Sequence, residues 1–138
     1  QVWFAGDHSD VGGSYPEDES RLADVSLQWM INQVNQTPDP IVIDEARLKL
    51  FPDPTAMQHD QVEELSDMWL WLPRVIRPRW PVKHRVEVRG AVLHDSVLDR
   101  FRAGLVLQHS HQRPYRPDNL RKDERLAEFY EGPEDGVG

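Results

Sequence analysis

The first fifteen residues constrain the fold more than any other stretch, because a short apolar run stops there and polar and glycine residues follow at once. Val2 to Ala5 has the β-branched and aromatic side chains typical of a buried strand. Three glycines then allow turn conformations that other residues avoid: Gly6, Gly12 and Gly13. The pattern predicts a strand followed by a tight loop with Asp7, His8 and Asp10, placed where α/β folds gather binding and catalytic groups. An ordinary Asp- and Gly-rich turn is the alternative that composition alone leaves open.

Three separated motifs run from residue 1 to about residue 120. They read Trp3-Phe4-x-Gly6-x-His8-x-Asp10-Val11-Gly12-Gly13 with Leu27-Gln28-Trp29-Met30 after it, then Leu93-His94-x-Ser96-Val97-Leu98-x-Arg100, then Tyr115-x-Pro117-x-Asn119-Leu120. Together they resemble the catalytic domain of the type VI secretion lipase-effector (phospholipase) family, a branch of the α/β-hydrolases. The resemblance implies an α/β fold, namely the C-terminal portion of an α/β-hydrolase-like domain, with few strands, flanking helices and long loops.

The first two motifs each contain a residue that could serve in catalysis, Asp10 and His94. A serine-type hydrolase needs a hydroxyl nucleophile, an imidazole that takes its proton, and a carboxylate that orients the imidazole. In α/β-hydrolases the chain order is nucleophile, acid, histidine, and the last two each follow a late strand. Asp10 and His94 fit that order, and the resemblance implies Asp10 as the acid and His94 as the general base. We expect His8, Gly12 and Gly13 to support the Asp10 loop, His8 through a hydrogen bond.

The nucleophile is missing from the pattern, because no Gly-x-Ser-x-Gly elbow occurs in the 138 residues. Ser14 follows the acid and precedes no elbow-type helix, and the family motif more often has a third glycine there. The chain also opens without methionine on what reads as an interior strand. We therefore expect the C-terminal part of a hydrolase whose nucleophile lies upstream, with the missing N-terminal half or a partner chain completing it. The resemblance implies a lipid or other carboxylic ester as substrate and no cofactor.

Two other functions remain open. The chain would serve as a non-catalytic interaction module if it folds only against its missing half or another protein. It would belong to a metal-dependent hydrolase if His8 and Asp10 were two ligands of a metal. No His-Glu-x-x-His pattern supports a metal site. His59 and His84 carry no signal, and His109 and His111 read as exposed loop residues.

A tryptophan-rich segment spans residues 68–81 and holds three of the five tryptophans, interleaved with arginine and proline. It is too short to span a bilayer. Trp69, Trp71 and Trp80 fit a lid or a lipid-facing loop at a membrane surface. They equally fit indoles that fill the core or cover a sheet edge.

Charge is divided unevenly along the chain. The net charge is -8, with -11 over residues 1–72, +7 over 73–125 and -4 over 126–138. The acidic total argues against a nucleic-acid partner, because phosphate binding needs a basic surface. The basic segment is expected to pair with the acidic one, and a face for anionic lipid is the alternative. No signal peptide is visible, so we expect a protein that is cytoplasmic in its producer and secreted without such a signal.

The remaining pattern divides the chain into residues 1–125, the hydrolase-like part, and 126–138, a mobile tail. A helix capped by Ser20 or Asp18 is expected up to Thr37, with so broad an apolar surface that it packs on more than one side. Asp44 is expected to cap a second helix over 45–51. Residues 85–89 alternate as a strand, and His94 then precedes a helix capped by Asp95 or Ser96.

Overall fold

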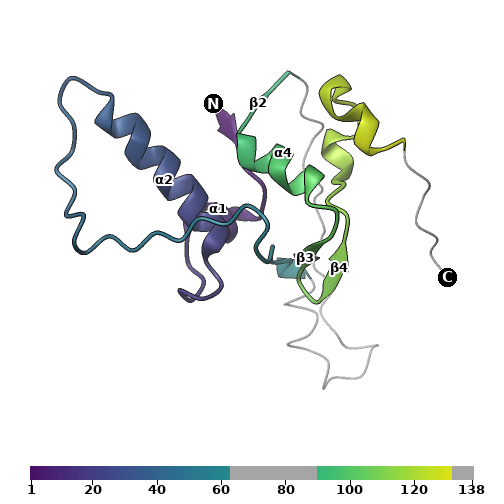
Figure 1. Cartoon of the computed structure of the whole chain (residues 1–138), viewed down its shortest axis with the longest axis horizontal. Coiled ribbons are helices and arrows are strands. Elements are labelled where there is room, and N and C mark those ends of the chain that lie inside the picture. Colours follow the sequence, from purple (N-terminus) through teal and green to yellow (C-terminus); the bar gives the residue numbers. More distant parts are fainter. Residues whose placement is uncertain (63–89, 132–138) are drawn as a thin grey trace.

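The first strand of the chain pairs with a strand from the far half of the sequence. The structure, a computed structural model, describes residues 1–62 and 90–131 (Figure 1). β1 (Val2–Trp3) runs parallel to β2 (Val92–Leu93). The N–H of His94 extends this pairing by donating to the carbonyl of Trp3 at 2.9 Å. Because the strands are parallel, the segments that follow them leave from the same edge.

The expected tight loop after β1 is a short helix. α1 (His8–Gly12) begins after Asp7, whose side chain accepts the N–H groups of Ser9 and Asp10. The Asp10 side chain accepts the N–H of Asp7 in return, which completes a capping box. The two aspartates three positions apart therefore make a helix start rather than an open turn.

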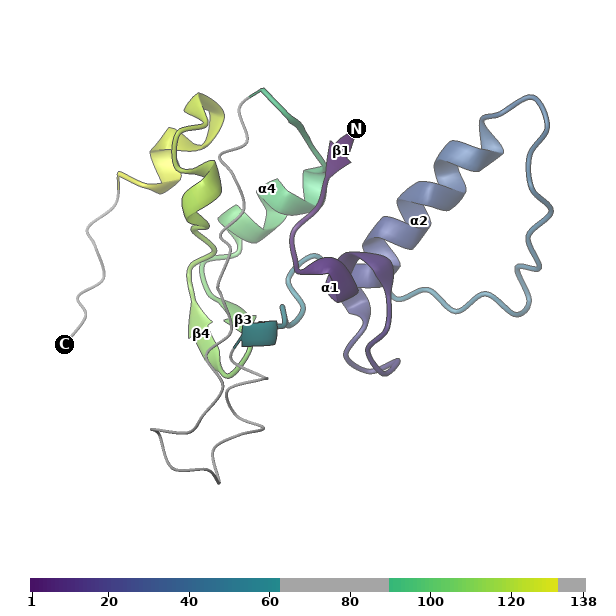
Figure 2. The same ribbon diagram turned by 180° about the vertical axis from the view of Figure 1, so that it is seen from behind.

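α2 (Arg21–Asn35) begins after Ser20 as expected, although the Ser20 side chain makes no capping hydrogen bond. Its buried residues lie in its first two turns: Leu22, Ala23, Asp24 and Val25. Further along, Leu27 is 44% and Met30 is 53% exposed. Leu27 and Met30 are therefore only partly covered by the described residues, and packing of this helix on more than one side stays a prediction. Figures 1 and 2 show why these two side chains are only partly covered, since α2 and the loop after it reach away from the other elements.

The second expected helix, over 45–51, does not form. Asp44 caps only a turn, in which its Oδ1 accepts the N–H of Ala46 at 3.2 Å. Ile41 is 66% and Val42 is 96% exposed, so the apolar run before the turn gains little burial. Without a face to bury, a segment this short has little to stabilise it as a helix.

The order strand, histidine, helix is confirmed around His94. α4 (Asp95–Arg102) follows β2, but its N-cap is His94 rather than Asp95 or Ser96. The hairpin β3 (Val106–Gln108) and β4 (His111–Arg113) comes next, followed by the 3₁₀ helices η1 (Asp118–Leu120) and η2 (Glu124–Phe129). The described elements are thus a mixture of helices and a few short strands, consistent with a small α/β arrangement.

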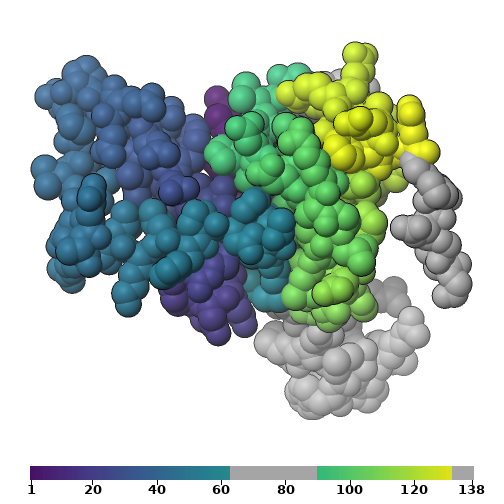
Figure 3. All heavy atoms as spheres, viewed as in Figure 1, coloured from purple at the N-terminus to yellow at the C-terminus, as the bar shows by residue number. Residues whose placement is uncertain are grey.

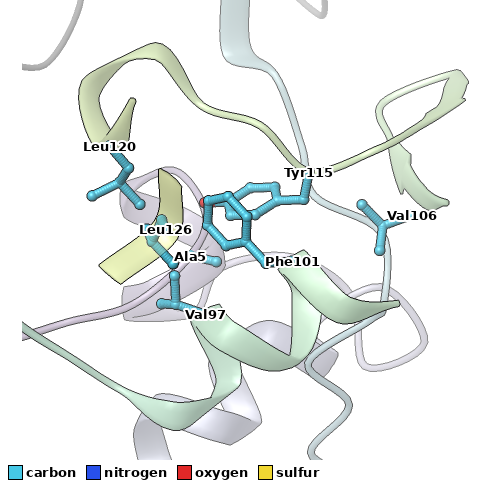
Figure 4. Close-up of a cluster of buried hydrophobic side chains, with 7 residues drawn as sticks. All are labelled: Ala5, Val97, Phe101, Val106, Tyr115, Leu120 and Leu126. Atoms are coloured by element: carbon cyan, nitrogen blue, oxygen red, sulfur yellow. The ribbon is translucent and has the colours of Figure 1, made fainter. Parts of the chain in front are cut away.

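The hydrophobic core lies between α4 and the C-terminal elements, around the ring of Phe101 (Figure 4). Its buried members are Ala5, Val97, Phe101, Val106, Tyr115, Leu120 and Leu126. Ala5 joins this core from the segment after β1, so the first strand is tied to the far half of the chain. The boundary expected at residue 126 falls inside η2, whose Leu126 is fully buried.

Several expectations concern residues outside the described ranges, namely the strand over 85–89 and the side chains of Trp69, Trp71 and Trp80. The pairing between the acidic and basic segments also stays a prediction. The arginine–carboxylate pairs described join near neighbours, such as Arg21 with Glu17 and Arg125 with Asp123. Among the described helices, none has the length and apolar character needed to cross a membrane.

Candidate active site

The carboxylate of Asp10, on α1, is buried and is held by three donors. Asp10 is 1% exposed. Its Oδ2 accepts the N–H of Asp7 and the N–H of His59, each at 3.1 Å. Its Oδ1 lies 2.7 Å from Nδ1 of His59. A carboxylate offers about four acceptor positions. These contacts therefore fix its orientation and leave one position on Oδ1 among the described residues.

His59 is the imidazole that contacts Asp10, and the sequence analysis missed it. It is 6% exposed, and the ring of Tyr15 stacks on it with centroids 3.4 Å apart and planes 10° apart. Its Nε2 lies 3.4 Å from Oε2 of Glu19. An ionised carboxylate can only accept, so the Nδ1 that faces Asp10 carries a proton. No pattern marked His59, because it lies in a polar stretch without periodicity, 49 residues after Asp10.

Asp7 connects the helix start to the stacked tyrosine. Its Oδ1 accepts the N–H groups of Ser9 at 2.8 Å and Asp10 at 2.7 Å. Its Oδ2 accepts the hydroxyl of Tyr15 at 3.1 Å. The side chain of Tyr15 therefore contacts both Asp7 and His59, and Asp10 sits within one connected polar network.

Arg100 holds the loop that carries His59. The residue is completely buried, and its Nη1 donates to the carbonyls of Pro54 and Ala56, each at 2.7 Å. Its guanidinium lies over the ring of Tyr115, 5.0 Å from the centroid. Burial lowers the pKa of Arg100, and the nearby charge of Asp10 acts in the opposite direction. The arginine of the second motif is thus a structural support for the loop that reaches Asp10.

His94 has different partners from those expected. Its Nδ1 accepts the N–H of Ser96 at 3.2 Å and lies 2.9 Å from the hydroxyl oxygen of that residue. Its ring stacks on Phe4, with centroids 4.6 Å apart. Since Nδ1 accepts a hydrogen bond from a backbone N–H, a neutral His94 carries its own proton on Nε2. A triad base needs the other tautomer, with Nδ1–H directed at the carboxylate.

The structure brings Asp10 and His94 to the same edge of the β1–β2 pair but does not join them. Within residues 1–62 and 90–131, no hydrogen bond links the two side chains. Asp10 contacts His59, and His94 contacts Ser96. The assignment of these two residues as acid and base stays a prediction.

The other expected site residues lie around α1. His8 is exposed at the first position of the helix, and its Nε2 lies 3.5 Å from Nε2 of Gln61. The hydrogen bonds that fix the Asp10 carboxylate come from Asp7 and His59 rather than from His8. Gly13 ends α1 with a φ of 77°, and its N–H donates to the carbonyl of Ser9. The supporting role expected for His8, Gly12 and Gly13 stays a prediction.

A cavity of about 710 Å³ opens beside α1. Its polar side includes Asp7, His8 and His59, and its apolar side includes Phe4 and Leu120. The surface view in Figure 3 shows the segment up to residue 62 running between the α2 part of the molecule and the C-terminal part. Within the described ranges, no group of three or more His, Asp or Glu side chains is arranged to hold a metal ion.

Comparison with known proteins gives one finding that bears on this site. A family model for the catalytic domain of Tle1-like phospholipase effectors of the type VI secretion system matches residues 1–33. The matched part contains β1, α1 and most of α2, and therefore Asp10. No curated protein and no solved structure gives a significant match to the chain.

Proposed function

We propose that this chain forms part of a serine-type hydrolase that cleaves carboxylic esters of lipids. The matched phospholipase-effector segment supports the reaction class, since it includes the helix that carries Asp10. In this proposal Asp10 is the acid, His94 is the general base, and the nucleophile comes from residues upstream of this chain.

The observation that carries the proposal is the parallel pairing of β1 with β2. It sends the Asp10 helix and His94 away from the same strand edge, although 84 positions separate them in the sequence. In open α/β sheets this edge is where ligands bind. The arrangement is what an acid and a histidine on successive strand-end loops require.

The proposed mechanism requires His94 to exchange its hydrogen bond with Ser96 for one with Asp10. The position left on Oδ1 of Asp10 is able to accept one more N–H. In the proposed mechanism His94 fills it after its Nδ1 releases Ser96 and the ring changes tautomer, Nδ1 taking a proton from water while Nε2 gives its own proton to water, so that the Nε2 lone pair can accept the nucleophile's hydroxyl proton. Asp10 then stabilises the imidazolium, and the imidazolium protonates the leaving alkoxide.

The substrate class follows from the phospholipase match, and the cavity, which is lined by chain neighbours of Asp10 and His94 though by neither of these two residues, is compatible with it. Phe4, Leu93 and Leu120 supply apolar surface, while Asp7 and His8 supply polar groups. A cavity with both kinds of lining accommodates an acyl chain next to a polar headgroup.

The test uses the longer polypeptide that the proposal requires, in which a Gly-x-Ser-x-Gly segment precedes this chain. We expect it to release fatty acid from phosphatidylglycerol vesicles. Asp10→Asn and His94→Ala should each lower kcat about 10³- to 10⁴-fold, the loss typical of a disabled triad. His111→Ala, an exposed histidine of β4, is the matched control and should leave the rate unchanged.

Two results would contradict the proposal. Full activity of Asp10→Asn would remove the acid role of Asp10 and with it the reaction mechanism. Hydrolysis of a nitrophenyl ester by the isolated 138-residue chain, lost on changing Asp10 or His94, would place the nucleophile inside this chain.

A non-catalytic interaction module is the second candidate, and one observation favours it. Leu27, Met30 and Ile41 are exposed on α2 and the loop after it. Leu27 and Met30 lie three positions apart and line the same surface hollow, and grouped apolar side chains of this kind mark protein interfaces. Inactivity of the longer polypeptide, together with concentration-dependent self-association that Met30→Gln abolishes, would favour this candidate over the hydrolase.

A further inference from the structure

The Asp10 carboxylate is positioned by a second chain segment, the loop at residues 58–60. We propose that His59 is a positioning residue, which holds Asp10 in the orientation that the general base requires. The inference rests on the proposed function, because it takes Asp10 to be the acid of the hydrolase site.

The first argument is that His59 contacts both carboxylate oxygens. Its backbone N–H donates to Oδ2 at 3.1 Å, and its Nδ1 lies 2.7 Å from Oδ1. Two donors from one residue on two oxygens of one carboxylate prevent the carboxylate from turning about its Cβ–Cγ bond. The capping bond from Asp7 to Oδ2 restrains it in the same sense.

The second argument is that His59 is itself held in place. Tyr15 stacks on the imidazole, and Glu19 lies 3.4 Å from Nε2. Arg100 fixes the preceding loop through the carbonyls of Pro54 and Ala56. A side chain restrained by packing and by its neighbours supports a catalytic group better than a mobile one does.

The third argument concerns the shape of the donor. The amide nitrogen of asparagine occupies a position close to Nδ1 of histidine, and that of glutamine a position close to Nε2. His59→Asn therefore keeps a donor for Oδ1, whereas His59→Gln moves it away and His59→Leu removes it. Comparing the three variants therefore separates the effect of this hydrogen bond on activity from the effect of having any side chain at position 59.

Kinetics of the longer polypeptide on phosphatidylglycerol vesicles give the first test. We expect His59→Leu and His59→Gln to lower kcat about 10- to 100-fold with little change in KM, as is typical when a supporting hydrogen bond is lost. His59→Asn should retain most of the activity. Equal loss in all three variants, or no loss in any, would overturn the positioning role.

Nitrogen NMR of the purified chain gives a readout that does not depend on activity. We expect the ring signals of His59, assigned by their absence in His59→Asn, to show a protonated Nδ1 at neutral pH. Asp10→Asn should shift these signals. An unprotonated Nδ1 in the wild-type chain would contradict the inference.

The two proposals fail in different ways. If Asp10→Asn is inactive and His59→Leu is fully active, Asp10 is the acid but His59 does not position it. If Asp10→Asn is fully active, the proposed function itself is wrong, whatever the NMR spectrum of His59 shows.

Discussion

At the scale of single residues, the candidate site depends on a close approach between Asp10 and the backbone at Gly6. Gly6 has a φ of 118°, a conformation that residues with a side chain rarely adopt. A Cβ added to Gly6 would collide with the Cβ of Asp10. Gly6 therefore satisfies two requirements at once, the backbone conformation after β1 and the space for the buried acid.

The first residue-scale prediction is that Gly6→Ala destabilises the chain. The backbone strain alone should cost roughly 1–3 kcal/mol, and the collision with Asp10 adds to it. Urea unfolding followed by circular dichroism measures the change. Gly12→Ala is the matched control, because no atom lies within 4 Å of the added Cβ and its φ is not positive. Equal stability of the two variants would show that Asp10 is not packed against Gly6.

At the scale of elements, α4 links the site to the core. Phe101 packs in the core from this helix, while Arg100 donates to the carbonyls of Pro54 and Ala56. One helix thus positions the loop that leads to His59. The two tasks fall on adjacent residues, Arg100 at the end of the second sequence motif and Phe101 directly after it.

We predict that Arg100→Met destabilises the chain by roughly 1–3 kcal/mol, because the half-buried carbonyls of Pro54 and Ala56 lose a charged donor, while removal of the buried Nε and Nη2, which have no hydrogen-bond partner among the described residues, offsets part of that cost. It should also weaken the contact between His59 and Asp10, visible as a change in the ring nitrogen signals of His59. Arg102→Met provides the control, since that side chain is 64% exposed. A similar unfolding free energy for both variants would contradict the supporting role of Arg100.

The elements also show which parts of the fold the sequence predicts. The strand at Val2, the start of α2 and the order strand, histidine, helix around His94 follow from local patterns. The helix expected after Asp44 does not form: Leu48 and Leu50 are only half-buried and Phe51 is 56% exposed, so these apolar residues gain little from sharing a helical face. Likewise, the exposure of Met30 depends on which elements lie nearby, and periodicity alone does not contain that information.

At the scale of the whole molecule, the site could be predicted only in part. Asp10 was identified from its loop and from the family resemblance. Its contact with His59 joins two segments 49 residues apart, and neither segment carries a pattern that names the other. Side-chain pairing over such a distance is set by the packing of the whole chain, which is why the imidazole seen beside Asp10 differs from the one expected.

Alkaline pH should test the packing of the C-terminal elements against the rest of the molecule. Burial raises the pKa of Tyr130 to about 12 from its ordinary value of 10.0, and its hydroxyl donates to the carbonyl of Pro117 at 2.8 Å. A raised folded-state pKa means that the unfolded chain loses this proton first. The stabilisation is therefore complete below about pH 10 and is lost as the pH rises through about 12.

This effect is measured by urea unfolding between pH 8 and 11 and by absorbance at 295 nm. Stability should decline above about pH 10, and Tyr130 should ionise near pH 12. Tyr130→Phe should remove the late ionisation step and flatten the decline. Ionisation of every tyrosine near pH 10 would contradict the burial of the Tyr130 hydroxyl.

The residue before His59 connects the site to the hairpin. The N–H of Gln58 donates to the carbonyl of Leu107 at 3.0 Å, and the carbonyl of Gln58 accepts the N–H of His109 at 2.7 Å. Any fluctuation that breaks these hydrogen bonds to the hairpin also displaces the neighbouring peptide unit, whose N–H, that of His59, donates to the Asp10 carboxylate. Deuterium uptake at the amides of Gln58, His59 and His109 should therefore proceed at a common rate, so that opening of the hairpin and release of the acid are one cooperative event.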